Sequence, residues 1–400
     1  MTTYNLKHLY KHFLKGHEGK LHFAAHSHHF WPDISRAAHL QYWDDCALSS
    51  DQKWDKIFGE IIPKAQTHVA SILRLKDSKQ IVFAPNTHEL LTRVLSLFLG
   101  KKSLYILTTS SEFHSFRRQI LRLSEIEQVK LDEVSTTSLL LNKEEFLGQL
   151  IQGLKKNPDI IFLSQVFFDS GFALNEDDIE ILLSHKSEKT IFVLDGYHGF
   201  AALPFDLSRF EGQIFYLAGG YKYAQAGEGA AFLVVPKGDW RPANTGWFAE
   251  FGELSEPKGA KVGYTNDGLA FIGATQDYSG LYRLNAVWDL FQQQNIYVPE
   301  IHKTIRELQI HFIASLPHEF NNSQHLIPLF DPTLPYHGHF ITYKAQNSTH
   351  ALELEKNLRR HGIITDSRGD RLRFGFGLYQ SKDDVDQLIS LIRKIFLFGD

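Results

Sequence analysis

Residues 213–235, "QIFYLAGGYKYAQAGEGAAFLVV", place one lysine between two apolar runs. Neither run alternates with polar residues, so both predict strands buried on the two faces of a sheet. Gly219 and Gly220 permit a tight turn and close approach of the backbone to a ligand. Partial burial of Lys222 just after them would lower its pKa below about 10.4, as a Schiff-base lysine requires. An isolated lysine there would more simply extend from the turn into water.

Four further apolar runs precede this segment, and helix-like segments separate several of them. The runs are "QIVFAP" (80–85), "SLYILT" (103–108), "DIIFLSQVFF" (159–168) and "TIFVLD" (190–195). Apolar residues recur at helical spacing in residues 90–98 and in "NKEEFLGQLIQGLKK" (142–156). This alternation predicts an α/β fold with a mainly parallel sheet in a large domain.

The pattern changes after about residue 280. "GLYRLNAVWDLFQQQ" (280–294) predicts the start of a long helix, and "SKDDVDQLISLIRKIF" (381–396) predicts a final helix with a capping box of Ser381 and Asp384. These elements indicate a smaller α+β domain at the C-terminal end. We expect an N-terminal segment (1–45) that contributes to the small domain and the active site, a large domain (46–280) and a small domain (281–400).

Composition limits the class of protein. The 400 residues are 43% hydrophobic and 22% charged, which is typical of a globular protein. The net charge of −4 and the scattered Lys and Arg argue against nucleic acid as a partner. Every apolar run is shorter than the roughly 20 residues of a membrane helix. One cysteine, Cys46, and no secretory leader pattern make the cytoplasm the expected compartment.

Two other segments complement Lys222. Asp195 ends a strand, where ligands of α/β sheets gather, and it could keep the ring nitrogen of pyridoxal phosphate protonated, with His198 packed on the ring or bonded to its oxygen. Asn86 and Thr87 open a helix whose free N–H groups could hold the phosphate. Taken singly, Asp195 fits a cap or turn, His198 a structural histidine, and Asn86 or Thr87 an ordinary N-cap. Together they fit one cofactor.

The order of motifs resembles class V of the aminotransferase superfamily, fold type I of the pyridoxal phosphate enzymes, and within it most closely kynureninase. The motifs are "LHFAAHSHHFWP" (21–32), "NTHE" (86–89), "SSEFHS" (110–115), "VFFDSG" (166–171), "LDGYHG" (194–199), "GGYKYAQAGEG" (219–229), "TGWF" (245–248) and "DSRGDRLRFGFGLY" (366–379). The resemblance covers most of the chain. It implies pyridoxal 5'-phosphate as cofactor, a small-molecule amino-acid substrate, and a homodimer with active sites at the subunit interface.

The resemblance also implies roles for individual residues. Lys222 would form the Schiff base and move the α-proton, Asp195 would pair with the ring nitrogen, and Arg373 would bind the substrate carboxylate. His198 would be catalytic, beside Lys222 and Asp195, and would also bind the cofactor. The other expected cofactor residues are Tyr221, Asn86, Thr87, Trp247, Phe113 stacked on the ring (His114 if the alignment shifts by one), and Thr275, which would reach the phosphate of the neighbouring subunit. Ser27 and His26 would face the substrate.

Some positions depart from the kynureninase pattern. Phe167 stands where the family has asparagine, and Asp169 where it has arginine. Cysteine desulfurases need a mobile catalytic cysteine between the lysine and the C-terminal domain, and the only cysteine here is Cys46. We therefore expect kynureninase-type hydrolytic Cβ–Cγ cleavage of kynurenine or 3-hydroxykynurenine, with transamination to a keto acid as the alternative.

A different class of function stays open at this stage. His22, His26, His28 and His29 lie within eight positions, and closely spaced imidazoles can bind Zn²⁺. No Glu or Cys stands beside them at a metalloenzyme spacing, so we expect no metal. A non-catalytic relative is the other alternative, although the presence of Lys222, Asp195 and Arg373 argues against it.

Overall fold

The computed structural model describes residues 6–126, 128–249, 261–317, 320, 326–335 and 337–395. Its α-helices are α1 (Lys11–Gly16), α2 (Ile34–Ser49), α3 (Lys53–Lys56), α4 (Ile62–Leu73), α5 (Thr87–Leu95), α6 (His114–Ser124), α7 (Thr136–Leu141), α8 (Lys143–Leu154), α9 (Glu176–His185), α10 (Ser279–Gln293), α11 (Val298–Ser315), α13 (Ser348–Arg360) and α14 (Lys382–Arg393). Its strands are β1 (Leu21–His22), β2 (Ile81–Ala84), β3 (Leu104–Thr109), β4 (Val129–Val134), β5 (Ile160–Ser164), β6 (Ile191–Asp195), β7 (Ile214–Gly219), β8 (Ala231–Val234), β9 (Leu326–Pro328), β10 (Phe340–Ala345), β11 (Ile363–Ile364), β12 (Asp366–Arg368) and β13 (Arg371–Gly375).

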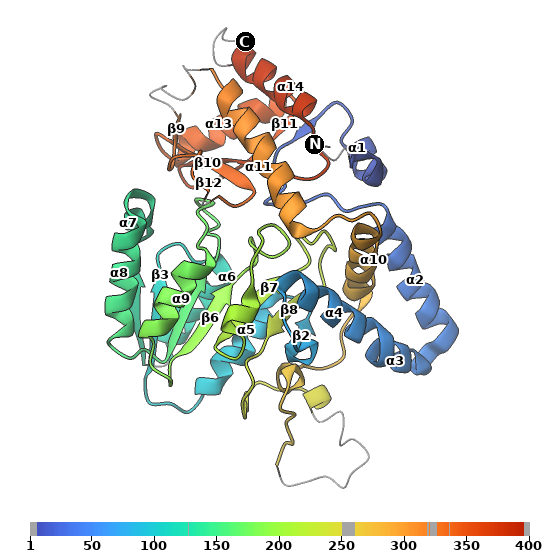
Figure 1. Ribbon diagram of the computed structural model, residues 1–400, viewed down its shortest axis with the longest axis vertical. Coiled ribbons are helices and arrows are strands. Elements are labelled where there is room, and N and C mark those ends of the chain that lie inside the picture. The colour runs from blue at the N-terminus through green and yellow to red at the C-terminus, as the bar shows by residue number, and fades with distance from the viewer. Residues whose placement is uncertain are drawn as a thin grey trace.

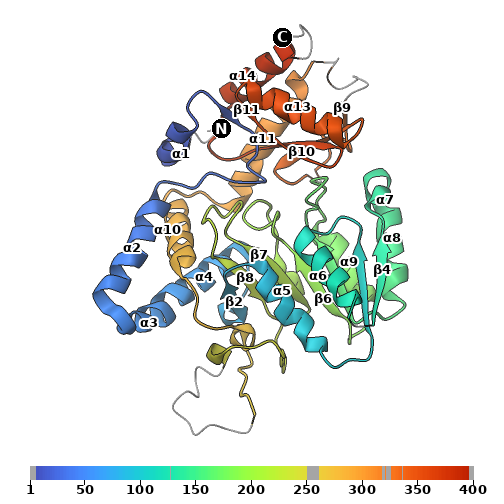
Figure 2. The same cartoon turned by 180° about the vertical axis from the view of Figure 1, so that it is seen from behind.

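A central sheet with the strand order β2-β8-β7-β6-β5-β3-β4 carries helices around it (Figures 1 and 2). Neighbours from β7 to β4 are parallel, whereas β8 is antiparallel to both β7 and β2. The mainly parallel α/β fold is therefore confirmed. The lysine segment is the reversal that joins β7 to β8, so it lies at the sheet edge where the parallel strands end.

Six strands and four helices (α5, α8, α10 and α14) lie where the apolar patterns predict them, with two differences. The run at 159–168 is not one strand, because β5 ends at Ser164 and the chain turns back so that Val166 pairs with Ala173. The strand β4, "VKLDEV", was missed because it is an edge strand in which half of the residues are charged and half are exposed. The predicted helix at 381–396 is α14 with its capping box of Ser381 and Asp384, and Phe396 lies outside the described residues.

The second sheet, ordered β12-β13-β10-β9, is antiparallel and lies with α11, α13 and α14 at the other end of the molecule (Figure 1). The N-terminal strand β1 pairs with β11, so the start of the chain joins this C-terminal part. The expected domain boundary at residue 280 falls in α10, which packs against α2 and α4. The division into 1–45, 46–280 and 281–400 stays a prediction.

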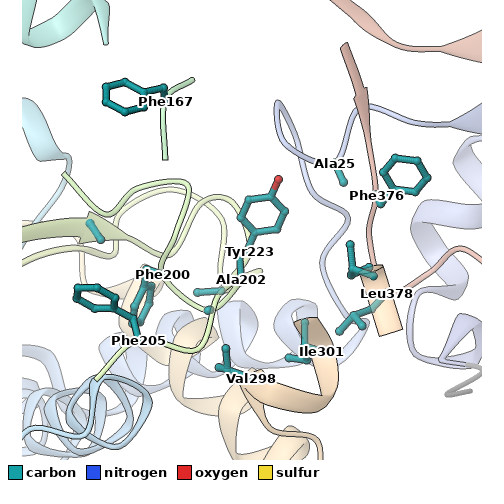
Figure 3. Close-up of a cluster of buried hydrophobic side chains, with 14 of the residues drawn as sticks. Ala25, Phe167, Phe200, Ala202, Phe205, Tyr223, Val298, Ile301, Phe376 and Leu378 are labelled. Atoms are coloured by element: carbon teal, nitrogen blue, oxygen red, sulfur yellow. The ribbon is translucent and has the colours of Figure 1, made fainter. Parts of the chain in front are cut away.

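One buried cluster connects the two parts of the molecule (Figure 3). Phe200 and Tyr223 come from the loops of the central sheet, Ile301 from α11, and Ala25 and Phe376 from the N- and C-terminal segments. Burying each large apolar side chain stabilises the fold by about 1.5–3 kcal/mol, so the cluster holds the loops on both sides in fixed positions. No helix in the described residues has both the length and the apolarity to cross a membrane.

Candidate active site

A cavity of about 360 Å³ lies beyond the carboxyl ends of β5, β6 and β7. It is lined by Ser27, Thr87, Phe113, Ser164, Val166, Phe168, Asp195, Tyr197, His198, Tyr221, Lys222, Arg368 and Arg373. The central sheet and its loops supply most of this lining, and β12 and β13 supply the two arginines. Eight of the residues expected from the sequence are thus brought together.

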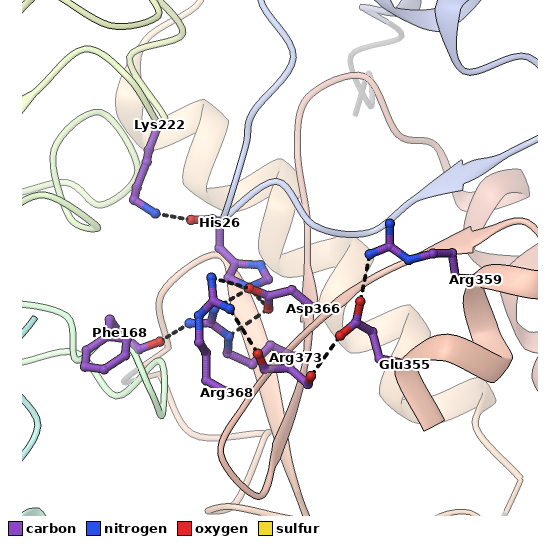
Figure 4. Close-up of polar contacts among 9 residues, drawn as sticks. His26, Phe168, Lys222, Glu355, Arg359, Asp366, Arg368 and Arg373 are labelled. Carbon is purple, nitrogen blue, oxygen red and sulfur yellow. Dashed lines mark hydrogen bonds and ion pairs between the residues drawn. The ribbon is translucent and has the colours of Figure 1, made fainter. Parts of the chain in front are cut away.

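Lys222 has the electrostatic state that the sequence predicted. Desolvation by burial, assisted by the positive charge of Arg373, lowers the pKa of its amine to about 7. Its Nζ donates a hydrogen bond to the backbone oxygen of His26 at 2.5 Å (Figure 4). A sizeable neutral fraction at neutral pH makes this amine a nucleophile and a base.

Asp195 and His198 lie at the floor of the same cavity. Burial raises the pKa of Asp195 to about 6, and its Oδ1 accepts one hydrogen bond from the Tyr197 backbone N–H at 2.9 Å. Burial also holds the pKa of His198 well below its usual range, and its Nε2 has no hydrogen-bond partner among the described residues. Asp195 has no ion pair among the described residues, and it lies near an imidazole whose Nε2 is unpartnered. This pair fits the protonated ring nitrogen and the ring of a cofactor.

The amino end of α5 forms another wall. Thr87 lines the cavity, whereas the Asn86 side chain caps the helix by accepting a hydrogen bond from the Glu89 N–H at 3.0 Å and is not part of the lining. The Tyr221 hydroxyl lies 3.0 Å from His28 Nδ1, which orients it. The first-turn N–H groups of α5 thus lie where an anion would bind.

Trp247 and Thr275 lie elsewhere in this chain. The Trp247 Nε1 donates to the Thr275 hydroxyl at 3.4 Å, and neither residue lines the cavity. Thr275 instead lines a larger depression of about 790 Å³, with Trp31 and Arg283. Within one chain, these two residues do not join the expected phosphate site.

Arg373 is buried and fixed by Asp366, a residue that sequence reasoning missed. Its Nε and Nη2 donate to the two Asp366 oxygens at 2.8 and 2.5 Å, and its Nη1 donates to the Phe168 carbonyl (Figure 4). The His26 Nε2 lies 2.8 Å from Asp366 Oδ1. Burial alone would raise the pKa of Asp366, but His26 and Arg373 hold it well below its usual range. Its place at the start of "DSRGDRLRFGFGLY" was the available signal.

The residues that depart from the kynureninase pattern have structural contacts. Phe167 is fully buried and packs edge-on against Phe146, away from the cavity lining. Asp169 forms an ion pair with Arg371 of β13 and accepts a hydrogen bond from the Ser111 hydroxyl at 2.7 Å. Phe167 therefore contributes to the packing of the core. Asp169 attaches the 165–174 loop to the C-terminal part of the molecule.

Aromatic side chains form one side of the cavity. Phe113 and Phe168 both line it, and their rings meet edge-to-face with centroids 5.6 Å apart. His114, the alternative stacking residue, begins α6 and does not line the cavity. Phe113 is therefore the better placed of the two.

The histidines at 22–29 point to separate partners. His22 contacts the Tyr379 hydroxyl, His28 that of Tyr221, and His29 the Phe30 carbonyl. Across the part of the chain that the structure describes, no group of three or more His, Cys, Asp or Glu is arranged to hold a metal. Cys46 lies on α2, outside the cavity lining.

The α/β fold, the desolvated lysine, the buried carboxylate and the helix amino end define a pyridoxal phosphate enzyme of fold type I, and the residues present fit that cofactor. The chain belongs to the aminotransferase class-V family, whose model matches residues 33–388.

Solved structures show the same fold. The cystine C–S lyase C-DES, in complex with its product cysteine persulfide, has a TM-score of 0.81 and 17% identity over 95% of this chain and 98% of its own. A C-DES mutant with glycine covalently linked to the PLP cofactor has a TM-score of 0.81 and 16% identity, over 96% of this chain and 98% of its own. The apo cysteine desulfurase of Thermococcus onnurineus NA1 has a TM-score of 0.79 and 16% identity, over 98% of both chains.

No curated protein matches the chain. Because the similar structures named above are a C–S lyase and a cysteine desulfurase, the particular closeness to kynureninase stays a prediction.

Proposed function

We propose that this protein uses pyridoxal phosphate for hydrolytic Cβ–Cγ cleavage of a kynurenine-type amino acid, giving an anthranilate-type product and alanine. The observation that carries the proposal is that Lys222, Asp195 and Arg373 share one cavity with the aromatic pair Phe113 and Phe168. The first three serve any α-amino acid, whereas Phe168, held edge-to-face by the Phe113 that stacks on the cofactor, selects one with an aromatic side chain.

Each residue has a task in this reaction. Pyridoxal phosphate, when bound, supplies the electron sink that stabilises negative charge at Cα. Asp195 keeps the ring nitrogen protonated, and Thr87, Tyr221 and the amino end of α5 hold the phosphate. Lys222, with a pKa of about 7, removes the Cα proton and can return it at the same face.

The substrate is held at both ends. Arg373 binds the α-carboxylate with the N–H groups that Asp366 and Phe168 do not use, because a guanidinium has five donors. Phe113 stacks on the cofactor ring, and Phe168, which meets Phe113 edge-to-face, packs on the side-chain ring of the substrate and excludes water from it. We assign to the Tyr221 hydroxyl, which lies 3.0 Å from His28 Nδ1, the transfer of a proton to or from the water that attacks the side-chain carbonyl.

The test is the absorption spectrum of the purified protein with pyridoxal phosphate, compared with Lys222→Ala and with Lys237→Ala. Lys237 is an exposed lysine paired with Asp77, so its variant controls for loss of a surface amine. We expect the band of lysine-bound cofactor in the wild type and Lys237→Ala but not in Lys222→Ala. Kynurenine should then yield anthranilate and alanine.

Other products would contradict the proposal. A keto acid with conversion to the pyridoxamine form would identify an aminotransferase. Release of pyruvate and ammonia from a sulfur amino acid would identify a β-elimination enzyme. Turnover of none of these amino acids would refute the substrate class while leaving the cofactor in place.

The assembly and compartment are part of the proposal. We place the active enzyme in the cytoplasm as a homodimer. The exposed apolar residues Leu40, Trp43 and Leu48 of α2 support a buried interface, and Leu40 borders the depression that holds Thr275. Light scattering during size-exclusion chromatography should give twice the chain mass of 45.9 kDa, and a monomer would contradict the dimer.

A further inference from the structure

Glu112 is a buried carboxyl group for which the proposed reaction has no use. It follows β3, is 4% exposed, and lies behind Ser164, which lines the cavity. Its contacts are with the hydroxyls of Thr109 and Ser164 and with the Ser164 backbone N–H. No lysine, arginine or histidine contacts it among the described residues. A carboxylate in such a place has no cation to offset its desolvation.

The negative charges around Glu112 favour its neutral form. Asp195 lies on the strand next to Ser164, and Ser164 and Asp195 are direct partners in the β5–β6 ladder. Asp169, on the loop after β5, bonds to Ser111 but is paired with Arg371. Burial, with a smaller effect of Asp195, raises the pKa of Glu112 to about 8. Two buried carboxyl groups so close together do not both ionise readily.

The hydrogen-bond pattern distinguishes the two oxygens of Glu112. Thr109 Oγ1 accepts from the Ser111 N–H at 3.3 Å, so its own hydrogen points to Glu112 Oε1 at 2.7 Å. The Ser164 N–H also points to Oε1, at 3.3 Å. Oε2 has a single contact, with Ser164 Oγ at 2.6 Å. In the ionised form Ser164 Oγ donates to Oε2. In the neutral form the carboxyl proton takes its place on Oε2, the oxygen with the fewer donors, and is donated to Ser164 Oγ.

We propose that Glu112 is a protonated positioning residue, which donates a hydrogen bond to Ser164 and thereby turns the Ser164 hydroxyl hydrogen into the cavity, toward the cofactor beside Asp195. An ionised Glu112 would instead accept that hydrogen and leave the cavity without this donor. Neutral Glu112 also adds no second negative charge beside Asp195. The role of Ser164 and Asp195 toward a cofactor rests on the proposed function, whereas the protonation of Glu112 does not.

The protonation is tested on the apoprotein, so it is independent of any substrate. The infrared difference spectrum of wild type minus Glu112→Gln at pH 7 should show the C=O stretch of a protonated carboxyl. The stretch should shift in Ser164→Ala, where the O–H loses its acceptor, and this variant keeps the test valid if Glu112→Gln does not fold. A carboxylate band in place of the protonated one would overturn the proposal.

The pH dependence of folding stability gives a second test of the protonation of Glu112. Because the pKa of Glu112 is raised in the folded state, the folded protein keeps a proton that the unfolded chain loses above about pH 4.3. Wild type should therefore lose stability relative to Glu112→Gln as pH rises from 5 to 8. Glutamine reproduces the donor and acceptor pattern of the protonated acid, with its N–H directed to Ser164. A constant difference across this range would overturn the proposal.

The role of Ser164 is tested by cofactor affinity. Ser164→Ala should bind pyridoxal phosphate about tenfold more weakly, the effect of one lost hydrogen bond, while Glu112→Gln should bind as the wild type does. Unchanged affinity in Ser164→Ala would refute the donor role. Failure of kynurenine to react would leave all three measurements interpretable, so this proposal and the proposed function fail separately.

Discussion

Asp366 and Arg373 are direct partners in the β12–β13 ladder, and the two oxygens of the first bind Nε and Nη2 of the second at 2.8 and 2.5 Å. The pairing fixes the plane of a buried guanidinium before any substrate arrives. Such preorganisation reduces the entropy that binding must otherwise offset. An arginine that the sequence assigns to substrate binding thus depends on a neighbouring carboxylate.

Asp366→Asn should therefore weaken substrate binding more than it slows the chemical step. Arg373 would lose a charged acceptor, and breaking a buried ion pair costs about 3 kcal/mol of stability. We expect KM to rise at least tenfold with a smaller change in kcat, measured by steady-state kinetics beside thermal unfolding. Asp383→Asn, an exposed residue at the start of α14, is the control. Equal losses in both variants would contradict this role.

Lys222→Met should make the apoprotein more stable at pH 7.5. Because the lysine pKa is lowered to about 7 by burial, the unfolded chain binds a proton between pH 7 and about 10.4 that the folded state does not. The wild type therefore gains stability as pH rises through this range, and the advantage of the variant should shrink by pH 9.5. Denaturant unfolding at several pH values measures this, and an advantage that grows with pH would contradict a lowered pKa.

Asn86→Ala should destabilise the protein by about 1 kcal/mol, the usual cost of a lost N-cap. Since Asn86 bonds to the Glu89 N–H and does not line the cavity, its loss should change cofactor affinity less than Thr87→Val does. Spectrophotometric titration with pyridoxal phosphate compares the two variants. A larger loss of affinity in Asn86→Ala would return Asn86 to direct phosphate binding.

Phe167→Asn, which restores the residue type of the kynureninase pattern, should destabilise the fold by about 3–5 kcal/mol. The change leaves a cavity beside Phe146 and buries an amide without partners. Because Phe167 does not line the active-site cavity, the KM of the surviving protein should stay near that of the wild type. Altered substrate preference without loss of stability would place Phe167 in the site.

The positions of Asp195 and Lys222 could be predicted because they depend on local patterns. Apolar runs without alternation specify buried strands, and the residue that follows such a strand lies at the sheet edge. The same reasoning gave α5, α10 and α14 from helical spacing and capping residues. It failed for β4, because an exposed edge strand lacks an apolar run.

By itself, then, the sequence determined the α/β fold and eight of the residues that line one cavity, since periodicity and burial preference are carried by neighbours in the chain. Only the tertiary structure decided which distant groups contact the cavity residues and set their orientation and charge. The His26 carbonyl reaches Lys222 across 196 positions, and Glu112 reaches Ser164 across 52. The placement of Trp247 and Thr275 outside the cavity was decided in the same way. Such contacts depend on how separate segments pack, and no local pattern in the chain encodes them.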